Sequence, residues 1–282
     1  MTILSTPIRA HVVAGGFPRG SSAGHDIDYA RLRILEVLQS NSRVVASVSC
    51  DFTDVAGWLD PCEFLVTYVA GPYPDDAQAD VIAKWLETGG RWLAFHGTSG
   101  GRAVPIPDGR PGRTMQRLRH HDLLGAFFLN HPPIRKFRVD VCDRDHALTR
   151  GLPESFEVMD ELYLLELRAP AESRVLLSTD DLGAQDPAPR NFGFQYGEDT
   201  SVGLDGRTRV LGYVQERGAG AIAYVALGHC HTPSTNIQPF VDTSVEPAGV
   251  TPLHFRGPWE TEAFGQLLRN GIEWGLEPRS AR

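Results

Sequence analysis

The chain has 282 residues and carries 35 acidic against 27 basic side chains, which leaves a formal charge of −8 at pH 7. This acidic balance argues against a nucleic-acid partner, because phosphate backbones are bound by clusters of positive charge. The sequence has no apolar run of about 18 residues, as a membrane span requires. Residues 1–10 lack the charged and apolar regions of a secretory signal. We therefore expect a cytoplasmic protein with no membrane partner.

The first half of the chain alternates short apolar runs with segments of helical periodicity. The pattern predicts strands at 8–14, 43–49, 64–70 and 92–95, and helices at 26–38 and 76–88. Strands that alternate with helices over short connections are typical of a mostly parallel sheet with helices on both faces. The predicted fold class is therefore α/β.

The second half changes character and contains long loops. The pattern predicts a loop at 101–119, a short helix at 120–128, antiparallel strands at 134–141 and within 157–167, a hairpin at 208–227 and a helix at 261–274. Segments 183–209 and 232–258 are interpreted as insertions, and such long loops usually serve function. No repeat or clear linker divides the chain, so a single domain over 1–282 is expected.

His96 is the most informative candidate because it directly follows a predicted strand. The apolar residues 92–95 lead into His96, and the loop 97–101 that comes next contains three glycines. In open parallel sheets, ligands bind beyond the carboxyl ends of the strands. The segment therefore predicts an imidazole in a cleft, with a structural histidine at a strand end as the alternative.

Other candidate groups also occur at element ends. They are His25 after the first strand, His131 before two prolines, His229 after the hairpin, and Asp160, Glu161 and Tyr163 in one acidic segment. The structural alternatives are a capping role for His131, a solvated turn for the two acids and a core aromatic for Tyr163. His231 is expected to be exposed, and His120 and His121 to lie on a polar helix face. The arginines of 102–119 are expected to form a solvated loop rather than a clamp for an anion.

Two chemistries fit these residues. Neutral imidazoles and a carboxylate form divalent-metal sites of the zinc or manganese kind, with His96, His229 and Glu161 as the expected ligands. Alternatively, a histidine and Glu161 act as a metal-free acid–base pair. Residues 15–20 have neither the G-x-G-x-x-G order nor the GK[ST] of a phosphate-binding loop. No nucleotide cofactor is therefore expected.

Six short motifs follow one another along nearly the whole chain. They are Gly89-Gly90 through Phe95-His96, Leu124 through Phe128 with His131-Pro132, His146 through Pro153, Phe156 through Tyr163, Gly218 through His229, and Gly271 through Trp274. In this order they resemble the trehalose-utilisation, ThuA-like family. The resemblance implies a flavodoxin-like fold similar to that of the class I glutamine amidotransferases. It also implies a role in disaccharide catabolism, and some members are associated with oxidised (3-keto) sugars.

The chain also departs from these relatives. The amidotransferases carry a cysteine nucleophile after the corresponding strand, where this chain has His96, so glutamine hydrolysis by a thiolate is not expected. Ala147 stands where the ThuA-like family usually has proline, and 183–209 and 232–258 are longer than in its shorter members. We expect these insertions to flank the cleft and to alter the choice of substrate.

The resemblance thus implies a carbohydrate-catabolism enzyme, a hydrolase or lyase acting on a disaccharide or a 3-keto glycoside. His96, Glu161 and His229 are the expected catalytic residues, either with one zinc or manganese ion or by acid–base chemistry. The expected sugar-binding residues are His25, Ser99, His131, Asp160 and Tyr163. The alternative is a non-catalytic sugar-binding or regulatory protein on the same scaffold. An edge strand offers a route to a homo-oligomer.

Overall fold

A computed structural model describes residues 7–107, 109–183, 187 and 192–277. The first part alternates strands and helices: β1 (Ile8–Gly16), α1 (Ile27–Gln39), β2 (Val44–Ser49), α2 (Val55–Leu59), β3 (Phe64–Ala70), α3 (Asp76–Glu87) and β4 (Arg91–Phe95). The second part contains β5 (Arg102–Pro105), β6 (Arg113–Gln116), α4 (Arg119–Leu124), β7 (Ala126–Asn130), β8 (Arg135–Val141), β9 (Ser155–Asp160), β10 (Leu164–Leu167), β11 (Arg174–Thr179), β12 (Arg209–Arg217), β13 (Gly220–Val225) and α5 (Glu262–Leu276). The short 3-10 helices are η1 (His96–Ser99), η2 (Ala147–Thr149), η3 (Pro170–Glu172) and η4 (Gly257–Glu260).

The centre of the fold is a nine-stranded sheet with the order β2-β1-β3-β4-β13-β12-β11-β8-β9. Neighbouring strands run parallel from β2 to β13 and antiparallel from β13 to β9. β3 lies within the parallel half and is buried from Phe64 to Val69, as expected for a strand that is covered on both faces. The predicted α/β, flavodoxin-like class is confirmed, and an antiparallel extension is added at one edge.

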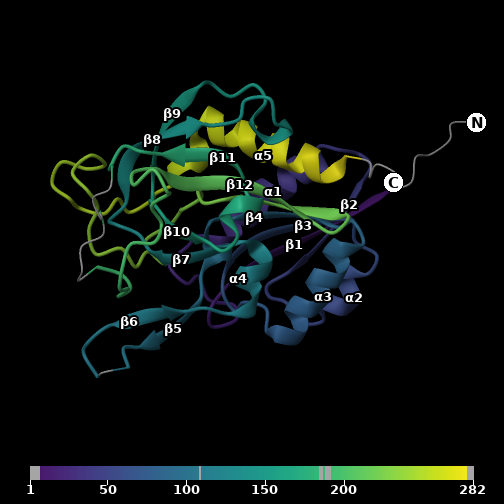
Figure 1. Cartoon of the computed structure of the whole chain (residues 1–282), viewed down its shortest axis with the longest axis horizontal. Coiled ribbons are helices and arrows are strands. Elements are labelled where there is room, and N and C mark those ends of the chain that lie inside the picture. The colour runs from purple at the N-terminus through teal and green to yellow at the C-terminus, as the bar shows by residue number, and fades with distance from the viewer. Residues whose placement is uncertain (1–6, 108, 184–186, 188–191, 278–282) are drawn as a thin grey trace, which may run out of the picture.

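Helices cover both faces of this sheet (Figure 1). α1 and α5 pack on one face, and α2, α3 and α4 lie on the other. α1 begins where the Asp26 side chain accepts the N–H of Tyr29, a cap that satisfies one free backbone donor. α5 approaches β3 closely because Gly275 has no side chain: a Cβ there would lie 2.0 Å from the Phe64 ring. The helices predicted at 26–38, 76–88 and 261–274 are therefore present, with ends shifted by one or two residues.

Two predictions for the second half are wrong. The helix predicted at 120–128 ends at Leu124, and Ala126–Asn130 forms β7 instead. Gly125 ends the helix because its φ of 97° is a conformation that glycine adopts most readily. The predicted loop 101–119 contains the hairpin β5–β6, which projects from the body of the molecule in Figure 1.

The predicted strands within 157–167 divide between two sheets. β9 belongs to the large sheet, whereas β10 pairs with β7 in a separate two-stranded sheet. The chain leaves regular strand structure at residues 161–163, between β9 and β10. This break puts Glu161 in a connection between two sheets and not within a strand.

The segments interpreted as insertions contain little regular structure where they are described. Residues 184–186 and 188–191 of the first segment lie outside the described residues. The remainder forms turns and isolated bridges up to β12, and residues 232–256 do the same up to η4. Among the described residues, the helices are all too short or too polar to cross a lipid bilayer.

Candidate functional site

Three histidines gather at the carboxyl ends of the parallel strands. His96 is the first residue after β4, His229 follows β13, and His25 lies in the connection from β1 to α1. His96 has a φ of 45°, in the left-handed region that residues other than glycine rarely adopt and that often marks functional sites. The backbone N–H of Asp26 donates to the carbonyl of Cys230 (2.7 Å), which holds His25 beside the His229 segment. The strand-end prediction for His96 is thus matched by its position.

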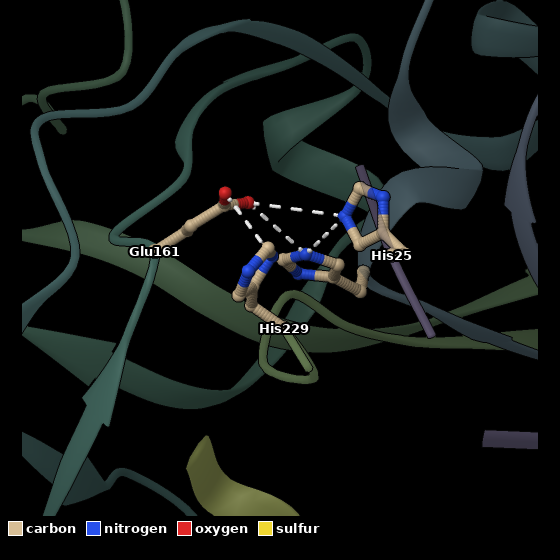
Figure 2. A group of neighbouring side chains, drawn as sticks. His25, Glu161 and His229 are labelled. Carbon is tan, nitrogen blue, oxygen red and sulfur yellow. Dashed lines mark hydrogen bonds and ion pairs between the residues drawn. The ribbon is translucent and has the colours of Figure 1, made fainter. Parts of the chain in front are cut away.

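Glu161 reaches the same place from the antiparallel half of the sheet. Figure 2 shows its carboxylate pointing toward the rings of His25 and His229. Oε2 of Glu161 lies 3.2 Å from Nε2 of His96 and 4.0 Å from Nε2 of His25, and Oε1 lies 3.1 Å from Nδ1 of His229. One ligand atom from each of these four buried residues lies within 4.8 Å of the other three. We call His25, His96, Glu161 and His229 the histidine–glutamate cluster.

Backbone carbonyls set the tautomers of two of these rings. Nδ1 of His25 donates to the Ala23 carbonyl (3.0 Å), and Nδ1 of His96 donates to the Ala226 carbonyl (2.8 Å). A carbonyl oxygen only accepts, so each Nδ1 carries the hydrogen and each neutral ring presents a bare lone pair at Nε2. These two Nε2 atoms lie 3.1 Å apart. Two lone pairs at this distance repel unless they share a proton or bind the same metal ion.

A second histidine sets the tautomer of His229. Nε2 of His231 donates to the Pro252 carbonyl (2.9 Å), so Nδ1 of His231 is the acceptor for Nε2 of His229 (2.9 Å). Nδ1 of His229 therefore faces Glu161 as a lone pair, and it is buried without a hydrogen bond to any described residue. His231 was expected to be exposed, but it is fully buried. The spacing of His229 and His231 is the missed signal, because residues two apart in an extended segment share a face.

Burial and charge within the cluster shift its ionisation. Burial alone would lower the pKa of His96, but the carboxylate of Glu161 outweighs it and raises that pKa. Burial alone would raise the pKa of Glu161, and the neighbouring His131 and His229 instead hold it well below its usual value. Burial lowers the pKa of both His25 and His229. The shifts therefore describe an ionised carboxylate that favours a proton on His96, while burial keeps His25 and His229 neutral. In such a site a metal ion can take the place of the proton.

Asp160 and Gln238 fix the position of Glu161, one through its backbone and the other through its carboxylate. The carboxylate of Asp160 accepts the backbone N–H groups of Gly228 (2.7 Å), His229 (2.9 Å) and Glu161 (2.8 Å). Burial nevertheless raises the pKa of Asp160 to about 7. The amide of Gln238 donates to Oε1 of Glu161, a contact that the sequence did not suggest because 232–258 was interpreted only as an insertion. Through its three backbone contacts, Asp160 orients the segments that carry Glu161 and His229.

A cavity of about 830 Å³ opens beside the cluster. His25, His131, Glu161 and Tyr163 line it, so these four predicted residues face the space that a ligand would fill. Nε2 of His131 lies 3.4 Å from Oε1 of Glu161, while its Nδ1 donates to the Pro132 carbonyl (2.7 Å). His96 and His229 do not line the cavity themselves. They contact His25 and Glu161, which do.

Two residues expected to bind sugar do not line the cavity. Asp160 is fully buried and uses its oxygens on the backbone, as described above. Ser99 is also fully buried, and its hydroxyl bonds to the Tyr224 hydroxyl (2.8 Å), which in turn donates to the His96 carbonyl (2.8 Å). The expectation for Ser99 is corrected accordingly: η1 turns its side chain into the core, where it supports the backbone of His96.

The other histidines and the arginine-rich loop also differ in part from expectation. His120 and His121 are fully buried and not on a polar helix face, and His120 stacks on Tyr73 with ring centroids 4.9 Å apart. In the loop, Arg117 pairs with Glu166 and Arg119 pairs with Asp80. Arg102 and Arg113 are exposed and lie on the wall of the cavity.

Comparison with known proteins identifies a family for this chain. The family model described as ThuA, trehalose utilisation, matches residues 21–242. A structure assigned as a ThuA-like protein from Bacteroides uniformis ATCC 8492 is 17% identical, with a TM-score of 0.61, over 98% of this chain and 94% of that chain. A second, from Parabacteroides merdae ATCC 43184, is also 17% identical, with a TM-score of 0.55, over 96% of this chain and 90% of that chain. At such identities the structures show a shared fold. The curated protein sequences contain no match. Because the family model covers most of its length, this chain belongs to the ThuA, or trehalose-utilisation, family.

Proposed function

We propose that this protein is a metal-dependent enzyme of carbohydrate catabolism, a hydrolase or lyase that acts on a disaccharide or a 3-keto glycoside. Family membership implies a carbohydrate-related role. The observation that carries the finer proposal is the convergence of three ring lone pairs and one carboxylate, with the backbone and His231 holding each tautomer. Three histidines and one carboxylate suit zinc or manganese.

The ligand residues would be His25, His96, His229 and Glu161, all of which are buried. A divalent ion there would polarise a sugar carbonyl or lower the pKa of a bound water. Each ring already donates its other N–H to an acceptor, as metal-bound histidines usually do. The donor set therefore fits the ion without any change of tautomer.

His131 is the best-placed general acid–base on the cavity wall. Its Nδ1 hydrogen is held by the Pro132 carbonyl, so Nε2, which lies 3.4 Å from Oε1 of Glu161, presents the lone pair that would accept a proton from a substrate. In a 3-keto glycoside, Nε2 would remove the proton from C2, and the electron pair would form the C1–C2 double bond as the C1–O bond breaks. The leaving oxygen takes up a proton, and addition of water across the double bond regenerates the 3-keto sugar. Tyr163 lies beside His131, with ring centroids 6.0 Å apart, and offers a surface for the sugar ring.

The same convergence favours an enzyme over a non-catalytic sugar-binding protein. A binding protein needs hydrogen bonds to hydroxyl groups, and it gains nothing from burying three lone pairs around a carboxylate, which is costly without a cation. A divalent ion held by these residues would activate an electrophile or a water molecule, which an enzyme needs and a binding protein does not.

Metal analysis of the untagged protein tests this proposal. We expect about one equivalent of zinc or manganese in the parent protein and less than a tenth of that in Glu161→Gln. His254→Gln is the matched control, because His254 is exposed and lies outside the cluster. Turnover of disaccharides and their 3-keto forms, followed by NMR, should track the metal content. A parent protein that takes up no metal after reconstitution, or that cleaves sugars equally well without it, contradicts the proposal.

A further inference from the structure

The polar groups of the cavity are confined to one end. His131 and Gln238 both contact Oε1 of Glu161, and His25 lies 4.0 Å from Oε2. All four side chains line the cavity, and the other three are within contact or ion-pair distance of the Glu161 carboxylate. This end, which we call the polar end, is where a sugar ring would find most of its hydrogen-bonding partners on the cavity wall.

The rest of the wall is largely apolar. It is formed by Phe17, Pro72, Tyr73, Met115, Leu118 and Phe194. The Tyr73 hydroxyl is not available to a ligand as a donor, because it donates to the Gly97 carbonyl (3.0 Å). Beyond the polar end, the charged or hydroxyl-bearing side chains on the described wall, apart from the tyrosines, are Ser22, Arg102 and Arg113.

Two large apolar side chains on this wall are exposed to solvent. Phe17 is 63% exposed and Ile237 is 71% exposed. Each packs against a glycine with positive φ: a Cβ on Gly71 would lie 2.7 Å from Phe17, and one on Gly24 would lie 2.8 Å from Ile237. These side chains are therefore seated against the backbone beside the cavity. Contiguous exposed apolar surface often marks a ligand-binding groove, and Phe17 and Ile237 line the same cavity.

A second sugar suits this surface poorly. Its hydroxyl groups would lose water and find few partners, at a cost of about 1–3 kcal/mol for each unsatisfied group. The cavity of about 830 Å³ is nevertheless much larger than a single ring requires, near the top of the range of roughly 300–1,000 Å³ for drug-sized ligands. The part of the cavity beyond the polar end therefore fits an apolar group that is continuous with the sugar.

We propose that the substrate is a glycoside whose sugar ring occupies the polar end and whose aglycone is apolar or aromatic and contacts Phe17 and Ile237. This inference rests on the proposed function, because it takes the polar end as the sugar site. The expected substrates are therefore hydrophobic glycosides and not disaccharides such as trehalose.

Binding of matched glycosides tests the inference. The probes are phenyl and methyl glucosides of both anomers, in their 3-keto and unoxidised forms, with trehalose as the disaccharide. We expect the phenyl glycoside to bind metal-loaded protein at least tenfold more tightly than the methyl glycoside by calorimetry. Phe17→Ser and Ile237→Ser should each remove most of this preference, since burying an aromatic ring is worth about tenfold or more in affinity. Leu253→Ser is the control, because Leu253 is also 71% exposed and does not line the cavity.

The outcomes separate this inference from the function on which it rests. Equal affinity for phenyl and methyl glycosides, or tighter binding of trehalose, overturns the apolar aglycone and leaves a metal-dependent sugar enzyme intact. A preference for aglycones with a carboxylate or phosphate that is lost in Arg102→Gln overturns it in favour of an anionic substrate. If the protein loads metal but binds none of the sugars, the proposed function fails and this inference fails with it.

Discussion

The substitution His231→Leu should weaken metal binding, although His231 is not one of the proposed metal ligands. His231 contacts His229 at Nε2, whereas Nδ1 of His229 is the atom that faces Glu161. His231 is fully buried, and its Nδ1 accepts the hydrogen of His229 Nε2 at 2.9 Å. His231→Leu leaves that hydrogen buried without a partner. His229 then either keeps an unsatisfied donor or moves the hydrogen to Nδ1, where it would block the lone pair that faces Glu161.

The expected size of this effect follows from two independent estimates. A buried donor left without a partner costs about 1–3 kcal/mol. Loss of a hydrogen-bond partner behind a metal-bound histidine weakens metal binding about 10–100-fold, which corresponds to about 1.4–2.7 kcal/mol. The two ranges agree, so we expect the Kd for zinc or manganese to rise by about 10–100-fold in His231→Leu.

Competition with a chromophoric chelator measures this Kd. His231→Asn is the matched variant, because its amide oxygen lies near the former Nδ1 and again accepts from His229. It should recover most of the affinity, whereas a general loss of packing would affect both variants. Urea unfolding of the metal-free proteins identifies any change in folding. An unchanged Kd in His231→Leu, or an equal loss in both variants, refutes the tautomer argument.

Three further results are expected. Chelation should lower the Tm by roughly 7 °C, because metal at a thousand times its Kd stabilises by about 4 kcal/mol and the unfolding entropy of a 282-residue chain is about 0.6 kcal/mol/K. A Tm that does not respond to chelation and re-addition of zinc or manganese contradicts the site. Asp160→Asn should destabilise the metal-free protein by about 1–3 kcal/mol in urea unfolding and should weaken metal binding. In the parent protein the Asp160 carboxylate accepts three backbone N–H groups, and the amide of the variant would turn a donor toward one or more of them. A variant equal to the parent in both measurements rules out this orienting role. Burial lowers the pKa of His11 to about 4, so the unfolded chain binds a proton at a higher pH than the folded protein does, and stability should fall by up to about 2 kcal/mol between pH 7 and pH 4.5. His11→Gln should lack this part of the pH dependence in urea unfolding, and identical profiles for parent and variant would show that His11 is not the cause.

Local sequence patterns predicted the elements that carry the parallel half of the sheet. The apolar run of β3 and the periodic apolar residues of α1, α3 and α5 specify burial through near-neighbour spacing alone. The same logic placed His96 at a strand end, because an apolar strand followed by glycines is visible within a dozen residues. Elements whose stability comes from distant partners were harder to predict. β7 follows a helix directly and pairs with β10, so its few residues looked like a continuation of the helix.

The sequence by itself determined which groups stand at element ends, but only the tertiary structure decided which of them meet. His96 and His229 were predictable candidates because β4 and β13 end next to them, yet the pairing of those strands joins segments about 130 residues apart. Glu161 arrives from the connection after β9, at the antiparallel edge of the same sheet, and Ser99, three residues from His96, turns into the core instead. The tautomers of His25, His96 and His231 could not be predicted from local sequence either, because the carbonyls of Ala23, Ala226 and Pro252 set them. Periodicity reports which face of an element is buried, whereas a site depends on distances between elements that only packing determines.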